Sequence, residues 1–183
     1  MKSKGCHFAW LTASVLLLSL IVAGCSSNNV IVQEPRVDLL AELQKAAREL
    51  MKKTARLDQD RPVIITTLVN IDDLQQSSTF GRQVSEVFSS AIASRDIPVV
   101  ELKMRETVFV REGTGELVLS RELRHLSTSH DAQAVLAGTY AVGGKNLYVN
   151  VRIIKTTDNR VLGSHNFSLP INGDIRSLLS NRR

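Results

Sequence analysis

Cys25 is the residue whose neighbours give it the most definite chemistry in this sequence. It stands directly after small residues at the end of an apolar run, residues 8–23, and two lysines precede that run. A basic head, a short apolar core and small residues before the cut are the layout of a secretory signal peptide. A cysteine at this place is the substrate of lipoprotein processing: a diacylglyceryl group alkylates the thiol, the chain is cut before the cysteine, and the new amine is acylated. The pattern predicts a signal peptide over residues 1–24 and palmitate-type acyl chains on Cys25.

The alternative to this lipoprotein signal is an ordinary signal peptide or a transmembrane anchor with a chance cysteine. A run of about 16 apolar residues is short for a bilayer span, which needs about 20. Ser26 follows the cysteine, and the absence of an aspartate there favours export to the outer membrane. We therefore expect a lipid anchor in the outer membrane, with the folded part facing the periplasm. Each buried methylene of the acyl chains contributes about 0.8 kcal/mol to that attachment.

Other patterns in the sequence do not indicate catalysis. There is no nucleophile elbow, phosphate loop or dinucleotide fingerprint. Residues 143–145, Gly-Gly-Lys, join two expected strands, whereas a phosphate loop leads into a helix. The histidines that follow the signal peptide lack metal-ligand spacing: His125, His130 and His165. We expect no enzymatic activity, no cofactor and no metal.

Asp72 and Asp73 are adjacent carboxylates that follow the first expected strand. In an open α/β sheet, ligands usually bind beyond the carboxyl ends of the strands, so a catalytic or metal role would be placed here. Neighbouring aspartates ahead of a helix serve turns and helix caps more often. We interpret the pair as part of a loop.

Composition restricts the partners of the folded part. Cleavage before Cys25 leaves 159 of the 183 residues, enough for one domain, and also removes Cys6, so no disulfide can form. The loss of Lys2 and Lys4 lowers the formal charge from +5 to +3, which is too small a surplus to indicate an anionic partner. The aromatic residues beyond the signal peptide are few and scattered, which argues against a stacking platform for nucleic acid or sugar. We expect no nucleic-acid partner.

Residues 37–183 are expected to form one α/β (α+β) domain after a lipidated tether over residues 25–36. Apolar residues at helical spacing predict helices over residues 37–56 and 80–94. Ser120 is the expected cap of a short helix through residue 130, and residues 174–180 are interpreted as a last helical turn. Continuous or alternating apolar runs predict strands over residues 63–69, 99–104, 134–142, 147–153 and 160–169. The first two strands flank a helix and should be parallel, whereas the last three are joined by turns as antiparallel hairpins. The expected order is α-β-α-β-(α)-β-β-β, a single mixed sheet with helices packed on it.

The first helix has one apolar face, and packing on the domain's own sheet is favoured over partner binding through that face. Its residues are Leu39, Leu40, Leu43, Ala46, Ala47, Leu50, Met51 and Leu57. Residues 30–32, Val-Ile-Val, are interpreted as tether, with a short edge strand as the alternative. Fully extended, residues 26–36 would reach at most about 36 Å.

Residues 69–82, Val-Asn-Ile-Asp-Asp-Leu-Gln-Gln-Ser-Ser-Thr-Phe-Gly-Arg, resemble the FlgO family of flagellar outer-membrane lipoproteins. The resemblance continues in residues 134–140, 148–152 and 160–162. It implies a fold similar to the periplasmic domain of curli-secretion lipoproteins and to the amino-terminal domain of TolB. It also implies a role in motility at the outer membrane, near the flagellar base, with flagellar basal-body or other envelope proteins as partners. Family members are also found away from flagellar systems.

The resemblance favours a structural role in a cell-envelope assembly. The loop over residues 70–79, with Asp72, Asp73 and Arg82, is the expected interaction surface, because exposed loops on a rigid sheet commonly carry recognition. Whether copies of the chain form a homo-oligomer or a ring is left open. The alternatives are a regulator of peptidoglycan synthesis and a component of a curli-like secretion system. A regulator that reaches through the cell wall needs a long disordered tether, and the tether here is short.

Overall fold

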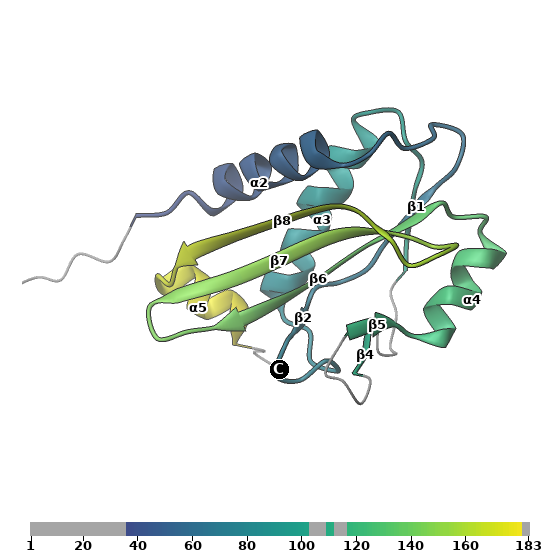
Figure 1. The fold of residues 1–183 in the computed structure, drawn as a ribbon. Helices are drawn as coiled ribbons and strands as arrows, with labels where there is room; N and C mark the ends of the chain where they lie inside the picture. The colour runs from purple at the N-terminus through teal and green to yellow at the C-terminus, as the bar shows by residue number, and fades with distance from the viewer. Residues whose placement is uncertain (1–35, 103–108, 112–116, 181–183) are drawn as a thin grey trace, which may run out of the picture. The chain divides into compact units, whose positions relative to one another are not determined.

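The computed structural model describes residues 36–102, 109–111 and 117–180 (Figure 1). Contacts divide the chain into two compact units, Met1–Gln33 and Glu34–Arg183, and all described residues belong to the second. The expected signal peptide, the lipidation site and the tether up to residue 35 lie outside the described residues. Within the described ranges, no helix is long and apolar enough to cross a membrane.

One mixed sheet of six strands organises the second unit. Its order is β3-β1-β6-β7-β8, and β2 also pairs with β6. β1 is parallel to β3 and β6, whereas β6, β7 and β8 are successive antiparallel neighbours. The strands are β1 Val63–Ile65, β2 Val69–Asn70, β3 Val99–Glu101, β6 Ala134–Val142, β7 Asn146–Lys155 and β8 Val161–Pro170. The expected α/β class, the mixed sheet and the antiparallel carboxy-terminal hairpins are confirmed. A separate antiparallel pair consists of β4 Phe109–Arg111 and β5 Leu117–Leu119.

Four helices in the described residues each begin after a side chain that caps the first turn. The cap oxygens of Asp38, Ser78, Ser120 and Asn172 accept hydrogen bonds from backbone amides three residues further on. Such caps satisfy amides that have no partner inside the helix. The helices are α2 Leu39–Lys53, α3 Thr79–Ala93, α4 Arg121–Ser129 and α5 Gly173–Leu179. All four lie where the sequence predicts helical structure.

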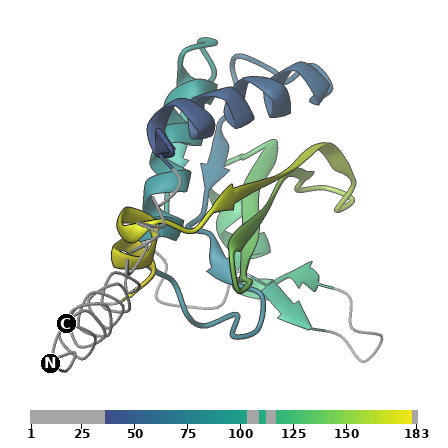
Figure 2. The same cartoon turned by 90° about the vertical axis from the view of Figure 1, so that its left-hand side faces the viewer.

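The two faces of the sheet bury two separate apolar clusters. Because side chains alternate along a strand, Val63 and Ile65 of β1 join the larger cluster and Ile64 joins the smaller one. The larger cluster packs against α2, α3 and α5, which Figure 2 shows on one side of the sheet. The smaller cluster includes Leu123 of α4. The sheet is therefore buried on both faces around β1 and β6.

Helix α2 packs on its own domain, as expected, but one of its predicted inward residues is exposed. Leu43 and Leu50 are fully buried, whereas Leu40 keeps 51% of its surface exposed. Leu39 packs against the larger cluster in the first turn. Leu40, about 100° further round the helix axis, is left on the outer side. Leu57 is buried but follows the helix instead of belonging to it.

The strand predicted over residues 63–69 is two strands with a break between them. Thr66 leaves the regular ladder, and both its amide and its hydroxyl donate to the carbonyl oxygen of Leu136, at 3.1 and 3.0 Å. The hydroxyl of Ser85, on α3, donates to the carbonyl oxygen of Thr66 at 2.8 Å. These bonds satisfy buried backbone groups that a break in a strand would otherwise leave without partners. The prediction of one continuous strand is wrong at this point.

Gly81 lets α3 lie directly on the strand break. A Cβ atom added at Gly81 would overlap the carbonyl oxygen of Leu68, a backbone atom that cannot move aside independently of the strand. Gly81 and Leu68 are both buried. The absence of a side chain at Gly81 therefore sets how closely the helix approaches the sheet.

The ring of Tyr140, on β6, packs against the start of α3. Its centroid lies 5.7 Å from that of Phe80, in an edge-to-face arrangement at 79°. Burial raises the pKa of the Tyr140 hydroxyl above its ordinary value, while a hydrogen bond with Ser78 and the charge of Arg82 partly oppose this. Ser78 is also the N-cap of α3. The strand, the cap and the first helical turn are thus held together at one point.

We predict that Gly81→Ala lowers the free energy of unfolding by about 1–3 kcal/mol, because the new methyl group forces α3 away from the sheet. Gly144→Ala is the matched control, since a Cβ there meets nothing within 4 Å. Urea denaturation of the mature protein measures both changes. Equal stability of the two variants would show that the helix does not depend on this contact.

We predict that the free energy of unfolding falls as pH rises above about 10 and that part of this fall is absent in Tyr140→Phe. The folded-state pKa of Tyr140 is raised, so the unfolded chain loses that proton first and gains stability from doing so. Denaturation series at increasing pH compare the wild type, Tyr140→Phe and the control Tyr148→Phe, which alters an exposed ring. If the two variants show the same alkaline loss as the wild type, burial of Tyr140 does not control it.

Candidate interaction surfaces

The loop over residues 70–79 is a folded turn whose own polar side chains hold its backbone. The side-chain oxygen of Asn70 accepts from the amide of Asp72 at 3.0 Å, and that of Asp73 accepts from the amide of Gln75 at 3.1 Å. The amide of Gln76 donates to the carbonyl oxygen of Asp73 at 2.9 Å. Asn and Asp favour such turns because their short side chains reach amides two residues on. The expected turn role of the aspartates is therefore confirmed for Asp73.

Both ends of this loop are fastened to the sheet. The amide of Asn70 donates to the carbonyl oxygen of Gln76 at 2.9 Å, and Val69 forms an antiparallel bridge with Ser77. The amide of Ile71 donates to the carbonyl oxygen of Tyr140 on β6, also at 2.9 Å. The loop consequently presents its outer side chains from a defined backbone.

The structure places the three predicted interaction residues on the outside of this region but does not join them. Asp72 and Asp73 are exposed on the loop, and Arg82 is exposed in the first turn of α3. The guanidinium of Arg82 donates to the hydroxyl of Thr79 at 2.9 Å. Among the described residues, no ion pair connects Arg82 with either aspartate. Their charges face solvent and are available to a partner.

The histidines do not converge. His125 lies on α4 and His130 is its C-cap, and both are exposed. His165 lies on β8, where it stacks on Phe167 and its Nδ1 is 3.5 Å from Nζ of Lys53. Burial and the Lys53 charge lower the pKa of His165. In the part of the chain that the structure describes, no group of three or more His, Cys, Asp or Glu side chains is arranged to hold a metal.

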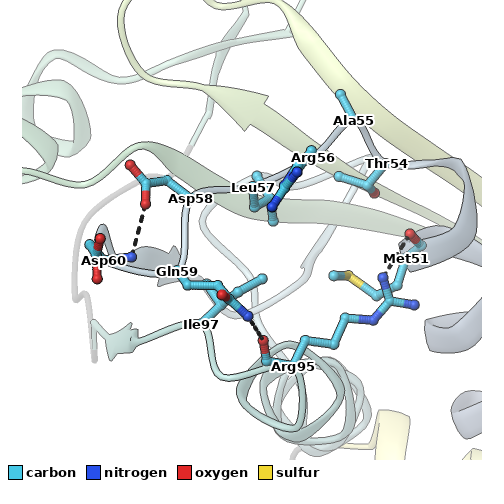
Figure 3. A pocket seen from close by; sticks show the side chains of 10 residues that line it. All are labelled: Met51, Thr54, Ala55, Arg56, Leu57, Asp58, Gln59, Asp60, Arg95 and Ile97. Carbon is cyan, nitrogen blue, oxygen red and sulfur yellow. Dashed lines mark hydrogen bonds between the residues drawn. The ribbon is translucent and has the colours of Figure 1, made fainter.

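A depression of about 680 Å³ lies between the ends of α2 and α3, and the sequence did not indicate it (Figure 3). The segment that follows α2 forms one wall, and Arg95 and Ile97, which follow α3, form the other. The two segments are far apart in the sequence. Their proximity depends on how α2 and α3 pack on the sheet, so no local pattern could reveal the depression. Its lining residues are Met51, Thr54, Ala55, Arg56, Leu57, Asp58, Gln59, Asp60, Arg95 and Ile97.

The wall after α2 is held by the side chain of Gln133. Its Oε1 accepts from the amide of Asp58 at 2.8 Å, and its Nε2 donates to the carbonyl oxygens of Asp58 and Arg61. Arg61 also pairs with Asp131 at 2.8 Å. These contacts bind the segment to the residues that precede β6, so the depression has a defined shape before any partner arrives.

Comparisons with known proteins agree with this architecture. The family described as FlgO protein matches residues 44–174. A comparison with curated proteins gives no match. Two solved structures of the LpoB C-terminal domain share the fold. The domain from Salmonella enterica has a TM-score of 0.50 at 8% identity, covering 69% of this chain and 94% of that one. The domain from Escherichia coli has a TM-score of 0.50 at 9% identity, covering 73% and 98%.

At these identities the LpoB likeness shows the fold alone. The family match is a match of sequence, so it shows more than the fold. It includes α3, the loop over residues 70–79 and the whole of β6, β7 and β8. It supports a cell-envelope lipoprotein. Since it spans most of the sequence, this chain belongs to the FlgO family.

Proposed function

We propose that this protein is an outer-membrane lipoprotein that acts as a structural component of a cell-envelope assembly, the flagellum. Lipid on Cys25 anchors it, and the folded unit faces the periplasm. The observation that carries the proposal is the FlgO family match over residues 44–174, which joins the lipoprotein signal at Cys25 in one sequence. A protein with these two features holds a folded module at the membrane, where an assembly can recruit it.

The loop over residues 70–79 supports recognition as the role of the module. Asn70 and Asp73 use side-chain oxygens to hold the loop backbone. The exposed charges of Asp72 and Arg82 are presented by this fixed backbone and by the first turn of α3. A rigid surface with unpaired charges favours specific association, because little conformational entropy is lost when a partner binds. We propose no reaction for this surface.

The expected tether keeps the module close to the membrane. Residues 26–36 span at most about 36 Å when extended, and a coiled tether spans roughly half of that. This reach suits a partner that itself lies near the outer membrane. It counts against the second candidate function, a regulator of peptidoglycan synthesis acting through the cell wall. The LpoB fold likeness is compatible with that candidate and with a component of a curli-like secretion system, but favours neither over the flagellar role.

Cys25→Ser is expected to abolish palmitate labelling, to leave the signal peptide uncleaved and to reduce swimming, because the serine hydroxyl cannot accept the diacylglyceryl group whose attachment precedes cleavage. Cys6→Ser is the control, since Cys6 lies within the expected signal peptide. Metabolic labelling, fractionation and a motility assay are read together. A Cys25→Ser protein that still carries palmitate, or that is still cut before residue 25, would refute the anchor.

Asp72→Lys is expected to reduce swimming without lowering the amount of protein, because it reverses an exposed charge whose side chain holds no turn. Asp73→Asn, which keeps the turn acceptor for Gln75 and removes the charge, should have a similar but smaller effect. Glu42→Lys on α2 makes the same charge reversal away from the loop, and its weak exposed pair with Lys45 contributes at most about 1 kcal/mol. Swimming unaffected by Asp72→Lys, or equally impaired by Glu42→Lys, would discard the loop as the interaction surface.

A further inference from the structure

The depression between α2 and α3 contains two arginines that form no ion pair with a carboxylate of the described residues. Arg56 belongs to the segment after α2, and Arg95 follows the end of α3. Asp58 and Asp60 line the same depression. Across the described residues, however, no ion pair includes any of these four side chains. The lining thus carries two positive and two negative side chains that these ion pairs leave available.

The two aspartates lie away from the guanidinium of Arg95, and Arg56 lies between them, beside Leu57 (Figure 3). Oδ1 of Asp58 accepts from the amide of Asp60 at 2.9 Å, which closes a turn. In Figure 3, Asp58 and Asp60 lie at the left end of the depression and the guanidinium of Arg95 lies at the right end, beside Met51. The lining therefore has an acidic end and a basic end.

Arg95 is fixed in position at the basic end. Its Nη1 donates to the carbonyl oxygen of Met51 at 3.2 Å, one of the last carbonyls of α2, which have no partner inside the helix. Its own carbonyl oxygen accepts from Nε2 of Gln59 at 3.1 Å. A guanidinium has five N–H donors in one plane, and only one of them is used here. The others are positioned to bind a carboxylate with both of its oxygens.

The lower part of the depression is apolar. Met51, Leu57 and Ile97 line it, and all three are buried. A volume of about 680 Å³ lies in the range of sites that hold small ligands or a few residues of a peptide. An aliphatic side chain can cover the small part of these residues that remains exposed while a neighbouring carboxylate meets Arg95. The acidic end opposes an extended polyanion such as nucleic acid or an array of lipid phosphates, which would place negative charge along the whole depression.

We propose that this depression binds a segment of a partner protein in which an acidic side chain stands next to aliphatic ones. The carboxylate is held by Arg95, the charge of Arg56 in the middle of the depression attracts it, and the aliphatic side chain lies over Met51, Leu57 and Ile97. A basic or neutral residue of the segment faces Asp58 and Asp60. The site is separate from the loop over residues 70–79, so it adds a second contact to the proposed scaffold.

The test uses the full lipidated chain in detergent and two fluorescent peptides, acetyl-Ala-Leu-Glu-Leu-Lys-amide and the same peptide with glutamine in place of glutamate. Fluorescence anisotropy measures binding. The glutamate peptide is expected to bind about tenfold more tightly, the scale of one charge-assisted bidentate contact, and to lose that advantage at raised salt. Equal binding of the two peptides, or no binding of the glutamate peptide, would overturn the proposal.

Arg56→Gln is the variant of choice, because Arg56 makes no hydrogen bond or ion pair within the described residues, whereas Arg95 also caps α2. It should reduce the preference for the glutamate peptide. Arg48→Gln, an exposed change on α2 outside the depression, is the matched control and should leave the preference intact. If both variants lost the preference equally, the preference would come from the overall positive charge of the surface, and this result would contradict the site. Displacement of the peptide by inorganic phosphate but not by free glutamate would assign the arginines to phosphate and also contradict it.

Discussion

The interruption between β1 and β2 is the constraint on which the rest of this unit depends. Polar backbone groups at Thr66 are buried there, and they are satisfied by the carbonyl oxygen of Leu136 and the hydroxyl of Ser85. Gly81 allows the helix that carries Ser85 to lie directly on Leu68. Because an unpaired buried backbone group costs about as much as a lost hydrogen bond, the strand break and the helix stabilise each other. This contact lies between the end of β1 and the start of β2, directly before the strand that leads into the loop over residues 70–79.

Helix α3 links the two surfaces to which we assign recognition. The loop leads into its first turn, and the depression adjoins its last turn. A helix of 15 residues is about 22 Å long, so the two surfaces lie at opposite ends of one rigid element. A single small ligand cannot touch both. A scaffold in an assembly can use the two ends for different contacts while the lipid on the expected tether holds it at the membrane.

Features that depend on local chemistry could be predicted from the sequence, and features that depend on distant contacts could not. Helical periodicity predicts α3, and alternation of apolar and polar residues predicts β7, because each pattern acts within one element. The sequence around Thr66 is a nearly continuous apolar run that gives no sign of a break in the strand. Ser85, whose hydroxyl satisfies the backbone at the break, lies 19 residues further along the chain. The turn role of Asp73 follows from its residue type. The depression follows from the packing of two helices, which leaves no local signal at Arg56 or Arg95.

Electron cryotomography of the flagellar base in cells with and without this protein tests the scaffold most directly. The account predicts that subtomogram averages from wild-type cells contain density on the periplasmic side of the outer membrane, beside the basal body, and that this density is missing when the protein is absent. Indistinguishable averages, at a resolution that shows the neighbouring rings, would contradict a structural role in the flagellum.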